Sequence, residues 1–391
     1  MDEHEFTATI RSILDEEFEE FGTGIGNLLL GSSQLLQYLN TKTRSASRGA
    51  KARGSFANLY AIYVLVEDYL RVRGWYSDYE GAQFSALFAR QRELPFGERL
   101  QNHALNSRLN EEYKKYFPTT EYLPILRDLT TSRYWFNEAL LRCQISTTRE
   151  VNIAPAVLKI IDAYVQAKRD AFELFVASCQ RLATVGKDTA DEGIEFVNSL
   201  LAPESDARIF EIVSFSILKA SYAAQAIWIG PERNTVEKQP LILYKTGRTN
   251  ANDGGIDFVM RPYGRFYQVT ETLDLRKYFL DIDKIQRFPI TFVIKIELPR
   301  DEIRSRIRNH AQQAFTAKRV VDAYMEAVEE IITLVELRNH LNGICVSGRF
   351  GEVLSEMVLQ ARVEFNMVDG DDLEMTAASL AIDDEDDGEV P

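Results

Sequence analysis

The stretch from Lys245 to Thr272, KTGRTNANDGGIDFVMRPYGRFYQVTET, gathers side chains that could do chemistry around two short apolar runs. Asp257 follows a pair of glycines, and Gln268 and Thr270 alternate along the second run. Because alternate residues of a strand share one face, we expect Gln268 and Thr270 to converge with Asp257 across a hairpin. Such oxygen donors suit a hard cation such as Mg²⁺. The glycines lack Cβ atoms and would let the backbone approach a phosphate closely.

The alternation of apolar and polar residues that is typical of strands occurs only in the region around this stretch. Pro262 and Gly264 suit a tight reversal between two strands, and Ser205 is a candidate N-cap for the preceding helix. The predicted order helix, three strands, helix, strand indicates an α+β core of about 100 residues. The elements expected are a helix over residues 205–225, strands over 241–246, 255–260 and 265–271, a helix over 273–288 and a strand over 290–298.

Helical periodicity predominates on both sides of this core. Residues 76–150 are mixed and mostly helical by composition. Ser55 is a candidate N-cap, and Gly343 is a candidate C-cap. The helices expected in the flanks cover residues 5–40 with a break at 22–27, residues 55–75, residues 154–182, and one long helix over 299–343.

The composition is that of an ordinary soluble globular chain, with 45% hydrophobic and 27% charged residues. No apolar run approaches the roughly 20 residues of a membrane span, and the acidic N-terminus does not resemble a signal peptide. We therefore expect a cytoplasmic protein without a membrane partner. The three cysteines have neither metal-ligand nor disulfide spacing and are expected to be buried apolar residues: Cys143, Cys179 and Cys345.

The net charge of −14 means that a polyanion would have to meet a local basic patch. Six acids lie in the last nine positions, so residues 381–391 are predicted to be a disordered tail. A basic segment without acidic residues is the candidate patch, and its small and hydroxylated neighbours would allow close approach to phosphates. The alternative is a solvated basic loop. The cations of this segment are Lys42, Arg44, Arg48, Lys51 and Arg53.

The sequence NDGGIDFVMRPYGRFYQVTE resembles the core motif of Mrr-like restriction endonucleases, in the PD-(D/E)XK nuclease superfamily. In that family a (D/G)-G-x-D turn is followed by a strand bearing Gln-x-Lys. The run RIFEIVSFSIL is similar to the family's preceding helix, which supplies an acid from a Phe-Glu pair. The resemblance covers residues 205–297 and implies the family's αβββαβ core.

By this resemblance, Glu211, Asp257 and Gln268 would hold Mg²⁺ at the scissile phosphate, and a metal-bound water would attack in line. The family's lysine falls on Thr270, whose hydroxyl carries no charge. Lys245, at the end of the neighbouring strand, is the favoured replacement. The other candidates are Lys277 and Lys284 on the following helix, Arg248 for a phosphate contact, and Glu271 as the acid if the pleat is shifted by one residue.

The resemblance implies a Mg²⁺-dependent endonuclease that cleaves duplex DNA, of the type II restriction or phage-defence kind, working as a homodimer. The chain lacks a GxxxxGK[ST] loop, so no nucleotide cofactor is expected. Arg44, Arg48 and Arg53 could each make a bidentate contact to guanine. The alternative is a DNA-binding or scaffold protein on a core that no longer cleaves. The expected regions are a mainly helical DNA-recognition region (1–200), the nuclease-like core (201–300), a helical region (301–380) and the tail (381–391).

Overall fold

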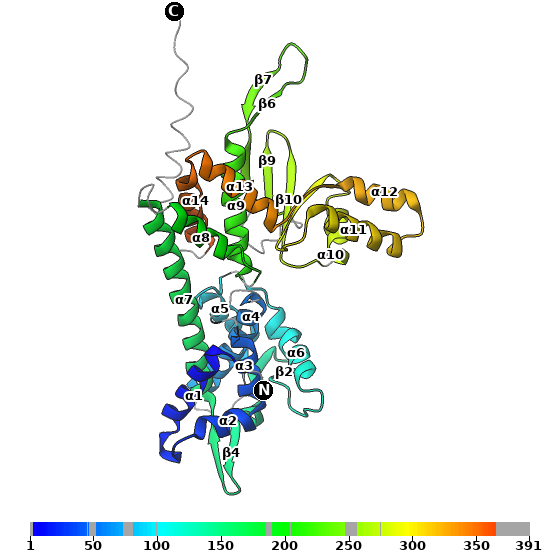
Figure 1. The fold of residues 1–391 in the computed structure, drawn as a ribbon. Coiled ribbons are helices and arrows are strands. Elements are labelled where there is room, and N and C mark those ends of the chain that lie inside the picture. The colour runs from blue at the N-terminus through cyan, green and yellow to red at the C-terminus, as the bar shows by residue number, and fades with distance from the viewer. Residues whose placement is uncertain are drawn as a thin grey trace, which may run out of the picture. The chain divides into compact units, whose positions relative to one another are not determined.

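The computed structural model describes residues 3–44, 46, 52–72, 81–98, 100–184, 190–203, 205–246, 256–273 and 275–364. Two compact units make up the chain, residues 1–174 and 175–391 (Figure 1). Arg48, Lys51, Arg248 and the tail of residues 381–391 lie outside the described residues, and so does the side chain of Arg53.

The first unit begins with helices that the apolar periodicity predicts. The expected break after the first helix is confirmed, because Gly22 and Gly24 adopt φ angles of 93° and 84°, which favour glycine. Ser55 is not the N-cap of α4, since the helix already begins at Ala52, upstream of that serine. The helices that begin in this unit are α1 Glu5–Glu17, η1 Glu19–Phe21, α2 Ile25–Ser32, α3 Gln34–Thr43, α4 Ala52–Arg71, α5 Phe84–Glu93, η2 Ala104–Arg108, α6 Leu109–Tyr116, η3 Glu138–Leu140 and α7 Ala154–Thr184, the last of which ends in the second unit.

Among the described residues, five strands also belong to this unit, so the prediction that residues 76–150 are mostly helical is wrong for their second half. The reason is visible in RYWF, where Tyr134 and Phe136 are buried and alternate with half-exposed neighbours, a period of two. The strands are β1 Ala82–Gln83, β2 Ile125–Asp128 and β3 Arg133–Phe136, in the order β1-β3-β2, and the hairpin of β4 Arg142–Ser146 with β5 Arg149–Asn152.

The second unit is a mixed α+β assembly around a five-stranded sheet of order β12-β11-β10-β9-β8. β8, β9 and the central strand β10 pair in antiparallel, whereas β10, β11 and β12 pair in parallel. The predicted helix, three strands, helix and strand all occur in this order, but an additional hairpin separates the first helix from the three strands. The elements are α9 Ala207–Ala223, β8 Ile242–Lys245, β9 Phe258–Arg261, β10 Arg265–Thr270, α10 Leu275–Lys284, β11 Ile290–Ile294 and β12 Val328–Ile332. A hairpin that the sequence did not predict, β6 Ala226–Ile229 with β7 Glu237–Pro240, lies between α9 and β8.

Different helices cover the two faces of this sheet. On one face the ring of Phe258 lies 5.1 Å from that of Phe215 on α9, so the side chains of β9 that share its face point toward α9. On the other face Tyr278 of α10 stacks on Phe292 of β11, with ring centroids 4.7 Å apart. Helix α9 also packs against α8 Ala190–Leu200, α13 Leu334–Val346 and α14 Phe350–Glu364, while α10 shares its core with α11 Arg300–Ala314 and α12 Lys318–Ala327.

The single long helix expected over residues 299–343 is wrong. Helices α11, α12 and α13 are separated by a strand, β12, which pairs with β11 in parallel. Its β-branched residues Val328, Ile331 and Ile332 are buried in the sheet, where such side chains pack better than in a helix. The sheet therefore crosses the expected boundary at residue 300.

Two predicted helix caps are also wrong by a few residues. Asp206, not Ser205, is the N-cap of α9, and its Oδ1 accepts a hydrogen bond of 2.8 Å from the amide of Arg208. Gly343 lies inside α13, which continues to Val346, and the left-handed glycine after the helix is Gly348, with φ 72°. A carboxylate at the N-cap satisfies the same open amides that a serine would.

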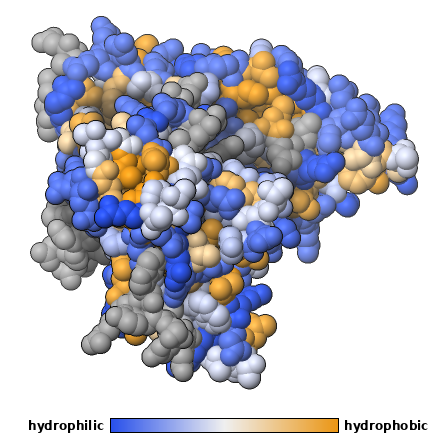
Figure 2. All heavy atoms as spheres, turned by 90° about the horizontal axis from the view of Figure 1, so that it is seen from below, coloured by the Kyte–Doolittle hydropathy of each residue, from blue (hydrophilic) through white to orange (hydrophobic). Residues whose placement is uncertain are grey.

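Hydrophilic residues cover most of the molecular face drawn in Figure 2, and apolar residues are exposed there in separate patches. Within the described ranges, no helix is both long enough and apolar enough to span a membrane. The cysteines form no disulfide, and Cys143 and Cys179 are buried as expected, whereas Cys345 is only partly covered.

Candidate active site at the ends of strands β9 and β10

Strands β9 and β10 stop pairing through their backbones at Asp257. Phe258 lies opposite Tyr267, and the amide of Asp257 donates to the carbonyl of Tyr267 at 2.8 Å. One step further along β10, the amide of Val269 donates instead to the Asp257 side chain, with 2.6 Å between nitrogen and Oδ2. The aspartate therefore replaces a backbone partner at the point where the two strands separate. This places its carboxylate at the end of the hairpin.

Gln268 and Thr270 lie on the α10 face of the sheet. Gln268 is opposite Phe292 and Thr270 is opposite Ile294, two buried residues of the core shared with α10. The Gln268 amide donates to the carbonyl of Val269 at 3.2 Å. Within the described part of the chain, its buried Oε1 accepts no hydrogen bond. The Thr270 hydroxyl donates to the carbonyl of Thr272 at 3.2 Å.

Asp257 and Gln268 thus both bond to the backbone of Val269, because the first accepts from its amide and the second donates to its carbonyl. A carboxylate and an amide oxygen are the donor types that Mg²⁺ takes, and a buried Oε1 without a partner is a suitable ligand atom. These two residues fit the ion. Over the described residues, no group of three or more His, Cys, Asp or Glu side chains is arranged to hold a metal. An ion here would depend on water and phosphate oxygens for its remaining ligands.

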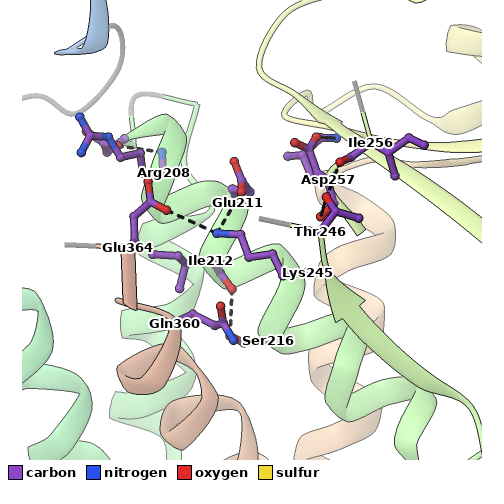
Figure 3. Close-up of polar contacts among 12 residues, drawn as sticks. Arg208, Glu211, Ile212, Ser216, Lys245, Thr246, Ile256, Asp257, Gln360 and Glu364 are labelled. Atoms are coloured by element: carbon purple, nitrogen blue, oxygen red, sulfur yellow. Dashed lines mark hydrogen bonds and ion pairs between the residues drawn. The ribbon is translucent and has the colours of Figure 1, made fainter. Parts of the chain in front are cut away.

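Glu211 and Lys245 form a buried ion pair on the opposite, α9 face. Lys245 lies opposite Phe258, whose ring packs on α9. Its ammonium is 3.0 Å from Glu211 Oε1 and 3.7 Å from Glu364 Oε2 of α14, and each of the three side chains is less than a tenth exposed (Figure 3). Removing one partner of such a group would leave a charge buried without compensation, so the cluster joins α9, β8 and α14.

The predicted site residues are therefore divided between the two faces of the sheet. Gln268 and Thr270 face α10, whereas Glu211 and Lys245 face α9. Alternation along β10 was correctly predicted, but the sequence does not reveal which face the preceding helix covers. Figure 3 shows Glu211, Lys245 and Glu364 directed toward one another, while Asp257 lies apart from them beside Thr246 and Ile256.

Lys295 is a buried cation that the sequence analysis did not select. It follows β11, and its amide donates to the carbonyl of Thr270 at 2.9 Å. Its ammonium donates to the carbonyl of Ser205 and to Glu271 Oε1, 3.1 Å away in the second case, and lies 5.6 Å from the centre of the Phe210 ring. A lysine inside the apolar run ITFVIKIEL was the available signal, since a charge in a buried strand needs a partner. That partner is Glu271, the predicted alternative acid.

The two candidate lysines of α10 differ in their surroundings. Lys277 is exposed, and the ammonium of Lys284 lies 2.8 Å from Asp281 Oδ1 on its own helix. Arg248 lies outside the described residues. The ammonium of Lys284 is therefore held by its own helix and not by the residues of the site.

The basic segment is described at its start, Lys42 to Arg44, and at its end, where Arg53 lies in the first turn of α4. The ammonium of Lys42 pairs with Glu112 of α6 and lies 5.6 Å from the Tyr38 ring centre, and its side chain is only 10% exposed. Lys42 therefore joins α3 to α6. Arg44 is exposed and lines a pocket of about 490 Å³ together with Tyr116 and Phe117 at the end of α6.

A second pocket, of about 420 Å³, lies beside α9 and α13 in the second unit. Here the Ser221 hydroxyl and His340 Nδ1 are 2.7 Å apart, and burial lowers the pKa of His340 below its ordinary value, which favours the neutral imidazole. The pocket carries both signs of charge, with Arg300 and Glu330 among its lining residues. None of the predicted site residues lies in it.

A scan against protein-family models finds no match for this chain, and comparisons with curated proteins and with solved structures find none either.

Proposed function

We propose that this protein is a Mg²⁺-dependent endonuclease that cleaves duplex DNA, of the restriction or phage-defence kind, acting in the cytoplasm. The observation that carries the proposal is that the side chains of Asp257 and Gln268 both bond to the backbone of Val269, where β9 and β10 separate. The succession of α9, β8, β9, β10, α10 and β11 supports it, because this is the order expected of the αβββαβ nuclease core.

In this proposal the residues of the strand ends bind and orient. Asp257 is fixed by the Val269 amide, so its carboxylate is held in place before substrate arrives. Gln268 contributes a neutral oxygen from a buried position. Mg²⁺, when bound by these oxygens, supplies an activated water and neutralises charge on the phosphate. Thr270 can offer a hydroxyl but no positive charge.

The test is incubation of the purified protein with supercoiled plasmid and phage DNA in the presence of Mg²⁺ or of EDTA. We expect Mg²⁺-dependent linear or nicked products, which disappear when Asp257→Asn removes the charge. Asp301→Asn is the matched control, because Asp301 is an exposed acid in the first turn of α11. Cleavage that survives Asp257→Asn, or that is unaffected by EDTA, would contradict the proposal.

A second candidate function is DNA binding without cleavage. The observation in its favour is that both buried lysines near the sheet, Lys245 and Lys295, have their ammonium groups paired with glutamates, while Thr270 occupies the motif position of the lysine. This alternative predicts that the protein binds duplex DNA and leaves it intact at every Mg²⁺ concentration tested.

A further inference from the structure

Six elements of the first unit follow one another as helix, strand, helix, helix, strand, strand: α4, β1, α5, η2 with α6, β2 and β3. The strands form one antiparallel sheet of order β1-β3-β2. Helix α4 packs against α5, η2 and β3, so the six elements share one core. We propose that they form a winged helix-turn-helix module that binds duplex DNA, with α6 entering the major groove and the β2–β3 hairpin as the wing.

The inner face of the η2–α6 helix is fixed firmly to this core. Leu105, Leu109 and Tyr113 recur every four residues and are fully buried. Between them Asn110 makes two hydrogen bonds with the backbone of Ile125 at the start of β2, donating to its carbonyl at 2.8 Å and accepting from its amide at 2.9 Å. The orientation of the helix relative to the β2–β3 hairpin is therefore set by the fold before any ligand binds.

The outer face of the same helix is exposed and mainly basic. It presents Arg108, Lys114 and Lys115, with one acid, Glu111, among them. Across the described residues, none of these three cations takes part in an ion pair. The other acid of the helix, Glu112, is partly covered and is neutralised by Lys42. The outward face thus carries a positive charge, although the whole chain is acidic, and it complements phosphates on both sides of a groove.

The β2–β3 hairpin lies beside this face and has a preformed tip. Arg127 of β2 is exposed, and its guanidinium donates to the Asn106 carbonyl of η2 at 3.0 Å. At the turn, Asp128 accepts hydrogen bonds from the Thr130 amide and the Thr131 hydroxyl, and these bonds lower the pKa of its carboxyl. Leu129 at the tip is 70% exposed, so the tip is available to a partner.

Duplex DNA is the partner that this surface fits. An α-helix fits the width of the major groove, and a helix carrying three unpaired cations attracts the phosphates that line it. The pocket lined by Arg44, Tyr116 and Phe117 brings the start of the basic segment to the end of α6, which extends the positive surface. Residues 94–103 join α5 to η2, a longer connection than the turn of about three or four residues in simple helix-turn-helix pairs.

The choice of DNA as partner rests on the proposed function, and the assignment of its reading element to α6 goes beyond it. The experiment measures binding of the full-length protein to a labelled random-sequence duplex in EDTA, by fluorescence anisotropy, over a range of salt concentrations. The test variant is Arg108→Ala/Lys114→Ala/Lys115→Ala. The matched control is Arg308→Ala/Lys318→Ala/Arg319→Ala, which removes three exposed cations from α11 and α12.

We expect the α6 variant to lose at least about tenfold in affinity at moderate salt, and the slope of log K against log salt to fall by about two to three. The control variant should stay within about twofold of wild type. Thermal unfolding of each variant checks that the fold is intact. Wild type that binds no duplex, or an equal loss in both variants, would overturn the inference.

The two proposals can fail separately. If the protein cleaves DNA with Mg²⁺ but the α6 variant binds as tightly as wild type, the inference fails and the proposed activity stands. If binding depends on α6 but no cleavage occurs with Mg²⁺, the activity fails and the inference stands. Tight binding of a protein to the α6 face, without DNA affinity, would contradict the assignment of the partner.

Discussion

At the scale of single residues, Asp257 combines a structural bond with the chemistry proposed for it. Its Oδ2 accepts from the Val269 amide, so replacing it with alanine would remove both a strand-end hydrogen bond and a charge. Asparagine retains an oxygen acceptor and loses only the charge. For this reason Asp257→Asn is the more informative variant, because a change in activity then need not come from a change in folding.

Gln268 carries the sharpest residue-scale prediction. Gln268→Leu removes a buried oxygen that lacks a partner, which is stabilising, and the 3.2 Å bond from Nε2 to the Val269 carbonyl, which is destabilising, so the unfolding temperature should change little. If the oxygen is a metal ligand, the same change should increase the Mg²⁺ concentration needed for cleavage roughly tenfold or more. Thermal unfolding and cleavage across a Mg²⁺ titration measure the two effects. A variant that is less stable and equally active would contradict the ligand role.

Lys245 provides a second residue-scale prediction. Lys245→Met removes the ammonium group that pairs with the buried carboxylates of Glu211 and Glu364. This should lower the free energy of unfolding of the second unit by about 3–5 kcal/mol. Adding Glu211→Gln should recover part of the loss. Lys219→Met is the control, since Lys219 pairs with Glu356 at 2.8 Å but is 38% exposed, and such pairs contribute about 0–1 kcal/mol. Chemical denaturation followed by tryptophan fluorescence gives the values, and equal effects of Lys245→Met and Lys219→Met would refute the prediction.

At the scale of elements, side-chain hydrogen bonds hold together strands and helices that lie apart in the sequence. Asn110 connects α6 to β2 with two hydrogen bonds. Asn110→Ala should cost about 1–3 kcal/mol, because a backbone amide and a carbonyl lose their partners. It should also weaken DNA binding, since α6 would no longer be held beside the hairpin. Asn309→Ala, at an exposed position of α11, is the control for stability and for anisotropy titrations.

Helices and strands in which apolar residues recur at regular positions were predictable from the sequence. α7 and α9 follow from apolar residues every three or four positions, and the β9–β10 hairpin follows from alternation around Pro262 and Gly264. Strand β12 was not predictable in this way, because VEEII is flanked by two helical patterns and is a strand only when it pairs with β11. The β2–β3 hairpin was missed because the overall composition of residues 76–150 suggested helix and hid the short alternation in RYWF.

At the scale of the whole molecule, charge determines how a nucleic acid would approach. The chain carries −14, and six acids lie in residues 383–391. Deleting residues 381–391 should raise the rate of association with duplex DNA severalfold at low salt, because repulsion between like charges is removed, and the difference should vanish at high salt. Stopped-flow anisotropy measures the association rate of the full-length and of the truncated protein at each salt concentration. A Gly/Ser tail of equal length is the control, and a gain that persists at high salt would contradict this explanation.

The sequence by itself determined the local order of the core elements and the alternation that puts Gln268 and Thr270 on one face, because both depend on the spacing of neighbouring residues. It also pointed to Asp257 at the end of the hairpin. Only the tertiary structure decided that α9 covers the other face, so that Glu211 and Lys245 pair with Glu364 instead of joining Asp257. Likewise, only pairing across about 50 residues, between β1 and β3, reveals the module that places α6. Contacts between distant segments have no period along the chain, and this is why the sequence could not supply them.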